Sequence, residues 1–251
     1  MLKKRIIPIL QLKDDELVKS IKFKNHKYVG DPINAVRIFN EKKVDEIAII
    51  DVTKSKKGEN LNYEIISDIA GECRMPFAYG GGINKLDQVE KLFSIGVEKI
   101  ILNSVVFNNY EFIESLSKIY GSQSIMVSVD INLNFLSKKK LYFWTKKKNL
   151  KLDINEHIKN CINYGAGEVL INTVYKEGTL SGFDFSVLNY LDIKLNVPII
   201  LNGGLNSINQ IKKVLKNPNI DAVGVGAMFI YYGPHRAVLI SYISNEERDE
   251  F

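Results

Sequence analysis

Short runs of apolar residues recur along the chain and alternate with longer segments in which apolar and polar residues mix. Each run has the length of a strand that is buried on both faces, and the seven intervals between the runs can each hold a helix. We therefore expect strands at residues 5–11, 46–51, 77–79, 99–103, 124–130, 168–173, 198–202 and 222–226.

Two of the intervals carry signals for the start of a helix. In residues 30–44, Asp31 precedes Pro32, an order that is typical of a first helical turn. Residues 84–96 have apolar side chains at a helical spacing that predicts one buried face: Leu86, Val89, Leu92 and Phe93.

Eight strand–helix units of this length favour an α/β protein with a single (β/α)8 TIM barrel. The chain has 251 residues, 45% of them hydrophobic, and no Pro- or Ser-rich linker, which suits one domain over residues 1–251. A doubly wound sheet of eight strands is the alternative.

The sequence also repeats itself. PFAYGGGIN at 76–84 returns as PIILNGGLN at 198–206, and DEIAII at 45–50 returns as GEVLIN at 167–172, each 122 residues later. Two fused half-barrels, roughly residues 1–120 and 121–251, explain this internal repeat.

The repeat pairs polar residues of the two halves. Glu46 falls opposite Glu168. The first strands match with a slightly different offset, since RIIPILQL at 5–12 lies over SIMVSVDI at 124–131, and Gln11 then falls opposite Asp130. One half keeps an acid at this strand end, and the other has an amide.

The formal net charge of +5 does not indicate a nucleic-acid binder, because the lysines are spread along the chain. They concentrate only in SKKK (137–140) and TKKKN (145–149), which flank LYFW. These runs predict a β-hairpin with solvated charged edges.

The remaining composition excludes several kinds of site. Cys73 and Cys161 have no CxxC or His–Cys spacing, so we expect buried thiols, no disulfide, no metal and no cofactor. The longest apolar runs are strand-sized, and Met1 is followed directly by a strand rather than by a signal peptide, so we expect a cytoplasmic protein with no membrane contact. The scattered histidines are interpreted as structural or surface residues: His26, His157 and His235.

Each half contains a candidate phosphate site. The glycines of YGGGIN (79–84) let backbone N–H groups approach an anion, and Asn103-Ser104 adds donors after the next strand. The other half has NGGLN (202–206) and GVGAM (224–228), where many barrels bind phosphate. Two equivalent sites predict a bis-phosphorylated ligand or the relic of one.

PFAYGGGI (76–83), GSQSIMVSVD (121–130), YGAGEVLIN (164–172), EGTLSGFD (177–184) and PIILNGGL (198–205) resemble segments of HisF, the synthase subunit of imidazole glycerol phosphate synthase. The resemblance extends over nearly the whole chain. It implies a TIM barrel that receives ammonia from a glutaminase subunit, HisH, at the N-terminal face of the barrel. The ammonia would cross to a phosphorylated small molecule, a bis-phosphate ribulosyl substrate, at the C-terminal face.

The resemblance assigns roles to individual positions. Asp130 matches the family's catalytic acid, but its partner on the first strand, an aspartate in the family, is Gln11 here. Other positions match the substrate site and the first phosphate site: Lys19 on the expected first loop, Asp51, Gly82, Asn103 and Ser104. Around the rest of the substrate and the second phosphate the matching residues are Glu177, where the family usually has aspartate, Gly178, Gly203, Gly204, Gly226 and Ala227.

Four charged residues at or near the beginnings of strands match the family's salt-bridged gate for ammonia: Arg5, Glu46, Lys99 and Glu168. Two positive and two negative charges can neutralise one another at a barrel mouth, where unpaired charge would be costly. The alternative is that these strand ends are charged because they are wet.

Ring closure in the family is acid–base work by two opposed carboxylates, and an amide cannot titrate near neutrality. Gln11 therefore argues against the ordinary histidine-pathway reaction. Residues 17–46 resemble a divergent branch of the family, associated with bacterial surface sugars, that lacks the strand-one acid. This resemblance implies that ammonia from a HisH-like glutaminase passes towards a sugar amidotransferase that makes acetamidino groups.

Two alternatives stay open. The chain is a true imidazole glycerol phosphate synthase subunit, a lyase of histidine biosynthesis that tolerates Gln11, or it is a non-catalytic scaffold that only activates its glutaminase partner.

Overall fold

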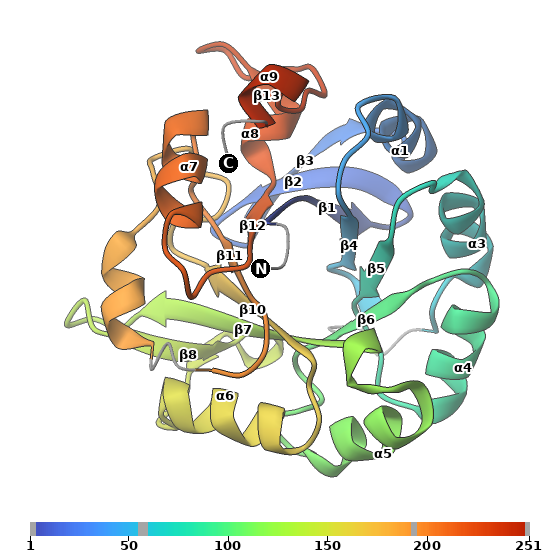
Figure 1. The fold of residues 1–251 in the computed structure, drawn as a ribbon, viewed down its shortest axis with the longest axis vertical. Helices are drawn as coiled ribbons and strands as arrows, with labels where there is room; N and C mark the ends of the chain where they lie inside the picture. The colour runs from blue at the N-terminus through green and yellow to red at the C-terminus, as the bar shows by residue number, and fades with distance from the viewer. Residues whose placement is uncertain (1–3, 55–59, 192–194, 249–251) are drawn as a thin grey trace.

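The computed structural model describes residues 4–54, 60–191 and 195–248. Eight parallel strands form a ring at the centre of the molecule, and helices surround it (Figure 1). The strands are β1 (Arg5–Lys13), β4 (Ile47–Asp51), β5 (Phe77–Gly80), β6 (Lys99–Leu102), β7 (Ile125–Leu133), β10 (Glu168–Thr173), β11 (Ile199–Asn202) and β12 (Ala222–Val225). The ring closes because β12 pairs with β1, and β10 pairs with both β7 and β11. The expected (β/α)8 barrel is confirmed, and a doubly wound sheet, which would have two open edges, is excluded.

Six of the eight strands lie within one residue of their predicted ends, but β1 and β7 continue further. The additional residues pair with antiparallel hairpins that rise from the C-terminal face. Gln11 is the register partner of Val18 in β2 (Glu16–Ile21), and Ile131 that of Leu141 in β8 (Lys139–Phe143).

The first of these hairpins, β2 with β3 (Lys24–Gly30), was not predicted. It places Lys19, which was expected in a loop, on a strand. The predicted second hairpin is confirmed as β8 with β9 (Lys148–Asn149), joined by the 3-10 helix η2 (Trp144–Lys146). A short pair, β13 (Tyr231–Tyr232) with β14 (Ala237–Val238), follows the barrel.

The helices around the barrel are α1 (Pro32–Glu41), α3 (Tyr63–Glu72), α4 (Leu86–Ser94), α5 (Glu111–Tyr120), α6 (Ile154–Asn163) and α7 (Ile208–Leu215), with short helices α8 (Ala227–Ile230) and α9 (Asn245–Arg248). Helix α1 begins as predicted, since the Asp31 side chain accepts a hydrogen bond from the N–H of Asn34 over 2.8 Å. The 3-10 helix η1 (Ser122–Ser124) lies between α5 and β7. The 3-10 helix η3 (Phe185–Tyr190) lies between β10 and β11.

Helix α4 differs from its prediction at one position. Leu86 was expected on the buried face but is 43% exposed, and Gln88 is buried instead. The Gln88 Oε1 atom accepts hydrogen bonds from the N–H groups of Asn84 and Lys85, over 2.8 and 3.1 Å. A polar side chain is therefore buried here because it caps the start of its own helix.

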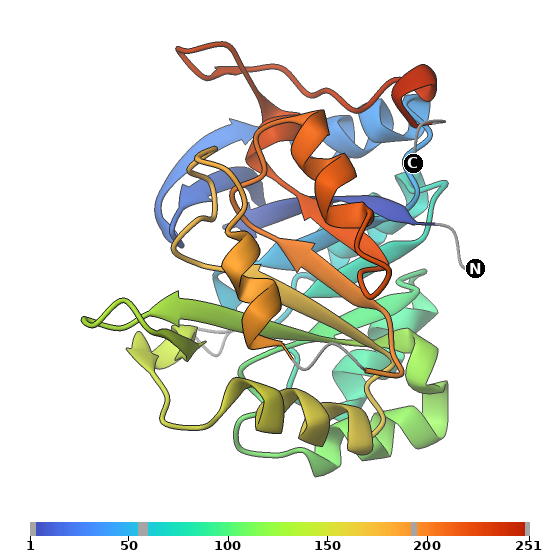
Figure 2. The ribbon, with the colours of Figure 1, turned by 60° about the vertical axis from the view of Figure 1, so that its left-hand side comes forward.

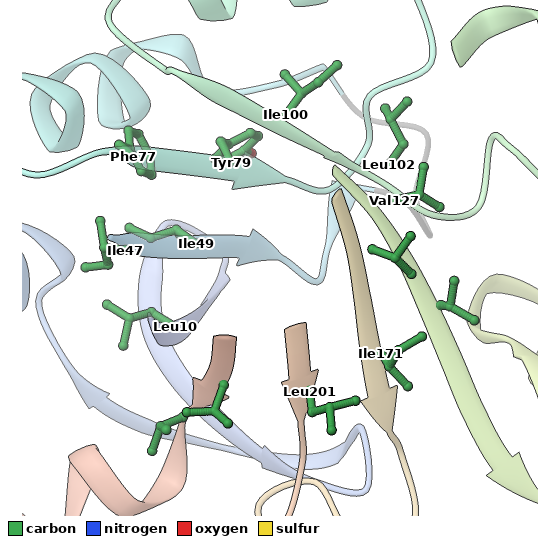
Figure 3. Close-up of a cluster of buried hydrophobic side chains, with 14 of the residues drawn as sticks. Leu10, Ile47, Ile49, Phe77, Tyr79, Ile100, Leu102, Val127, Ile171 and Leu201 are labelled. Carbon is green, nitrogen blue, oxygen red and sulfur yellow. The ribbon is translucent and has the colours of Figure 1, made fainter. Parts of the chain in front are cut away.

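Alternate residues of the strands face two separate apolar layers. Outward side chains pack beneath the helices, as Figure 3 shows for Leu10, Ile49 and Tyr79. Inward side chains fill the middle of the barrel: Ile7, Ile9, Ala48, Ala78, Ile101, Met126, Leu170, Ile200 and Ala222. Cys161 is buried as expected, but Cys73 is only half-buried.

Within the described residues, no helix combines the length and the apolar character needed to cross a bilayer.

Candidate functional site

A cavity of about 480 Å³ lies at the C-terminal ends of the barrel strands. Its wall brings together six residues selected from the sequence: Gln11, Asp51, Gly82, Asn103, Ser104 and Asp130. Asn172 and Asn202 also line it; neither was predicted as a site residue, although Asn202 begins the candidate phosphate segment NGGLN. A sequence signal that could have identified them is an asparagine at the end of an otherwise apolar run, as in EVLIN and IILN.

Asp130 is the buried acid of this cavity, with 3% of the residue exposed. Nδ2 of Asn172 donates to Oδ1 of Asp130 over 3.0 Å, and Nδ2 of Asn202 donates to Oδ1 of Asn172 over 2.8 Å. Burial raises the pKa of the Asp130 carboxyl to about 6, although hydrogen bonds from Asn172 and Asn103 oppose this shift. A group with this pKa can both accept and release a proton near neutrality.

Gln11 lies in the same cavity wall and is 5% exposed. Its Oε1 atom accepts a hydrogen bond from the backbone N–H of Ser20 over 3.0 Å. The strand-one position therefore anchors the hairpin of β2 and β3 and contributes no titratable group.

Asp51 is the second carboxylate in the wall, and its hydrogen bonds serve the turn that follows β4. Oδ1 of Asp51 accepts from the N–H groups of Thr53 and Lys54, over 2.8 and 3.2 Å. Burial raises the pKa of Asp51 against the effect of these two donors. The arrangement is that of an Asx turn, which shapes the rim of the cavity.

The two glycine loops predicted from the repeat have similar φ angles. Gly81 and Gly203 have φ values of 113° and 111°, and Gly82 and Gly204 have φ values of 73° and 85°. A side chain at Gly81 would collide with the backbone carbonyl of Asp51. A side chain at Gly203 would likewise collide with Thr173, so both loops need glycine for positive φ and for a close approach.

The surroundings of the two loops differ. The first loop opens into the 480 Å³ cavity beside Asn103 and Ser104. The second loop borders a space of only about 10 Å³, lined in part by the other predicted residues Glu177, Gly178, Gly226 and Ala227. Lys19, which is 2% exposed, forms an ion pair with Glu177 there.

Aromatic residues from the two hairpins meet above the cavity. Phe23 and Trp144 pack edge to face with ring centroids 5.5 Å apart, and both line the cavity. Figure 2 shows the two hairpins on the side of the molecule away from the N-terminus. They bound the entrance at which a ligand would arrive.

The four predicted gate residues come together at the opposite end of the barrel. Arg5 Nη1 lies 2.6 Å from Glu46 Oε2 and 3.1 Å from Glu168 Oε1. Lys99 Nζ lies 3.0 Å from a carboxylate oxygen of each glutamate. The two glutamates are buried, so the four charged side chains form ion pairs with one another and are not merely hydrated at the surface.

Two of the histidines are in the interior or on the surface, as expected, and the third lies in the cavity wall. His157 is buried, and its Nδ1 lies 2.7 Å from the Tyr110 hydroxyl oxygen. Burial lowers its pKa to about 4, which keeps it neutral. His235 is exposed, whereas His26 lines the cavity.

Comparison with known proteins gives a consistent result. Residues 5–236 match the family described as histidine biosynthesis protein. A Leptospira borgpetersenii protein with the provisional name imidazole glycerol phosphate synthase subunit HisF is 40% identical over 252 residues, which cover 99% of this chain and 98% of that protein. A Pseudomonas aeruginosa protein provisionally named subunit hisF2 is 40% identical over 242 residues, 96% of each chain. The imidazole glycerol phosphate synthase subunit HisF of Lactococcus lactis subsp. cremoris is 34% identical over 232 residues, 92% of this chain and 90% of that one.

Proposed function

The chain belongs to the histidine biosynthesis protein family of HisF-type barrels, and we propose that it conducts ammonia from a HisH-like glutaminase for the amidation of a bacterial surface sugar. In this proposal the acceptor is a sugar that gains an acetamidino group on a separate amidotransferase. The barrel supplies the passage and the docking surface for the glutaminase.

The observation on which the proposal depends is the hydrogen bond between Gln11 and Ser20. Its side-chain oxygen is bonded to Ser20, and an amide exchanges no proton near neutrality. Asp130 therefore faces no titratable group from strand one, and Asp51 is held by its own turn. A cyclisation that depends on two opposed carboxylates lacks one of them.

The opposite end of the barrel supports the conducting role. The charged ring of Arg5, Glu46, Lys99 and Glu168 lies at the face where the family receives ammonia. Above the ring the barrel interior is apolar, from Ile7 to Ala222. An apolar interior binds ammonium poorly but tolerates the small neutral ammonia molecule, because burial of an unpaired charge is far more costly.

A second candidate is the imidazole glycerol phosphate synthase reaction itself. The geometry of Asp130 favours it, because a buried carboxyl with a pKa near 6 is suited to acid–base work. Under this candidate Asp130 acts with Asp51 or with water in place of the missing strand-one acid.

The test compares cyclase rates. The purified chain and the Lactococcus lactis HisF relative are each given ammonium chloride and the bis-phosphate ribulosyl substrate. We expect a rate roughly 10²–10⁴ lower for this chain, the usual contribution of one positioned acid–base group. A rate within tenfold of the relative would overturn the sugar-amidation proposal and establish the second candidate.

A positive test combines the barrel with a HisH-like glutaminase and a sugar amidotransferase that makes acetamidino groups. Glutamine-dependent amidation of the sugar should require the barrel, whereas amidation driven by added ammonium chloride should not. If glutamine supports amidation equally well without the barrel, the conducting role is wrong. If the barrel raises glutaminase turnover but not amidation, it is a scaffold.

A further inference from the structure

We infer that the ligand of this barrel carries a single phosphate group, held at the first glycine loop, because a buried Lys19–Glu177 pair occupies the second. The inference rests on the proposed function in one respect, because it concerns a ligand at the C-terminal end of the same barrel. It departs from the two phosphate sites that the repeat in the sequence predicts.

The backbone alone does not distinguish the two loops. Gly81 and Gly82 adopt almost the same φ values as Gly203 and Gly204. The φ values thus do not separate the two loops, and what differs is the group that each loop faces.

At the second loop the facing groups are already an ion pair. Lys19 and Glu177 are 2% and 3% exposed, and the ammonium of Lys19 contacts one carboxylate oxygen of Glu177. The other oxygen of that carboxylate accepts from Nδ2 of Asn202 over 3.3 Å. The ammonium also lies against Gly226, where any Cβ atom would collide with it.

The space that remains at the second loop, about 10 Å³, holds at most one water molecule. A phosphate entering there would have to separate a buried ion pair and would meet the Glu177 carboxylate. Both steps oppose binding. The positive charge that such a site needs is neutralised from within the protein.

The ion pair is fixed from both sides of Lys19. The N–H of Ser20 is bonded to Gln11, and the N–H of Lys22 donates to the backbone carbonyl of Glu177 over 2.8 Å. The loop that carries Glu177 is held in turn by Arg236, which donates to the carbonyls of Gly178 and Thr179 over 3.2 and 3.0 Å. Withdrawal of Lys19 would break this set of contacts.

The first loop has room for a phosphate, and no ion pair of the described residues fills it. The 480 Å³ cavity beside Gly82 and Ser104 is lined by Lys146 and by the amides of Asn172 and Asn202, as well as by the carboxylates of Asp51 and Asp130. Trp144 offers an aromatic face at the entrance. This combination fits a small, hydroxyl-rich molecule with one phosphate, because amides bind hydroxyl groups and an aromatic ring packs on a sugar face.

The test follows backbone N–H resonances of the full chain during titration with inorganic phosphate at constant ionic strength. In the wild type, saturable shifts are expected at Gly82 and Ser104, with none at Gly204 and Ala227. Saturable shifts at both loops in the wild type would overturn the inference.

Glu177→Ala provides the complementary measurement, because it removes the carboxylate, creates space and leaves the Lys19 ammonium without its partner. We expect this variant to gain phosphate-dependent shifts at Gly204 and Ala227, with the affinity at Gly82 unchanged within twofold. Glu114→Ala is the matched control, since Glu114 pairs with Lys118 on the exposed face of α5, and it should behave as the wild type. No gain in a folded Glu177→Ala variant would overturn the inference, and the wild-type titration decides alone if that variant does not fold.

This experiment separates the inference from the proposed function. A second phosphate site in the wild type would refute the single-phosphate ligand and leave ammonia conduction intact. Rapid cyclase turnover would refute sugar amidation without affecting the titration.

Discussion

The side-chain oxygen of Gln11 accepts a hydrogen bond from the backbone N–H of Ser20 over 3.0 Å, so Gln11 joins the barrel wall to its first hairpin. Ser20 is fully buried and follows Lys19 on β2. A change at residue 11 is therefore expected to act on the hairpin as well as on the chemistry of the cavity.

Gln11→Ala should loosen this hairpin. The N–H of Ser20 would lose its partner in a buried place, at a cost of about 1–3 kcal/mol. Hydrogen–deuterium exchange of residues 16–30 should become faster, while exchange in α5 stays unchanged. Gln123→Ala, which removes an exposed glutamine, is the control. Unchanged exchange in the hairpin would show that the Gln11–Ser20 contact does not hold it.

Gly81→Ala should destabilise the protein strongly. Its φ of 113° disfavours any side chain, and a Cβ atom would collide with the carbonyl of Asp51. We expect a loss of about 1–3 kcal/mol in the free energy of unfolding from the strained φ alone. Gly71→Ala is the matched control near the end of α3, where a Cβ atom meets nothing within 4 Å. It should be stabilising by about 0.5–1 kcal/mol, as measured by urea unfolding. Equal effects at the two positions would contradict the described loop.

The pKa of Asp130 predicts a dependence of stability on pH. The pKa is 3.8 for an unperturbed aspartate and about 6 in the folded protein, so between these values the native state binds more protons than the unfolded state. The free energy of unfolding therefore falls as pH rises through this window, by about 3 kcal/mol for a shift of this size. Asp130→Asn cannot ionise and should be more stable than the wild type at pH 7.5 by up to that amount, with little difference at pH 4.

Asp184→Asn is the control of opposite sign. Burial alone would raise the pKa of Asp184, but hydrogen bonds from Ser186 and Tyr175 lower it to about 2. Its ionised form is thus favoured by folding, and the variant should be less stable than the wild type at pH 7.5. Denaturant unfolding at both pH values measures both variants. Destabilisation by Asp130→Asn at pH 7.5 would contradict the raised pKa.

Lys99→Ala tests the charged ring. The change leaves Glu46 and Glu168 with Arg5 as their only cation of the ring, and because the ring is partly exposed we expect a loss of roughly 1–4 kcal/mol. Glutamine-driven amidation should fall while glutaminase turnover and ammonium-driven amidation persist. Lys118→Ala removes an exposed lysine and should change neither reaction. Equal amidation by both variants would leave the ring with a structural role only.

The barrel was predictable because its strands are local apolar runs, whereas the position of Lys19 was not. A lysine in ELVKSI reads as solvent-exposed, and its burial depends on Glu177, which is distant in the sequence. The turn between β2 and β3 contains Lys22 and Phe23 at φ values of 52° and 60°, without the glycine or asparagine that announces such a turn. The ring of four charges was accessible because each residue stands at or beside the beginning of a predicted strand. The partners of Gln11 and Asp130 required the folded structure, since the pairing of β1 with β2 and of β7 with β10 sets them.

The four ion pairs at the bottom of the barrel connect in a closed cycle, from Arg5 to Glu46, Lys99, Glu168 and back to Arg5. A cycle with one link removed is still a chain that includes all four members. Any single contact can therefore separate while every charge keeps a partner, and no intermediate with an isolated ion arises. A single ion pair at this end of the barrel would lack this redundancy, since breaking it would leave both charges without a partner.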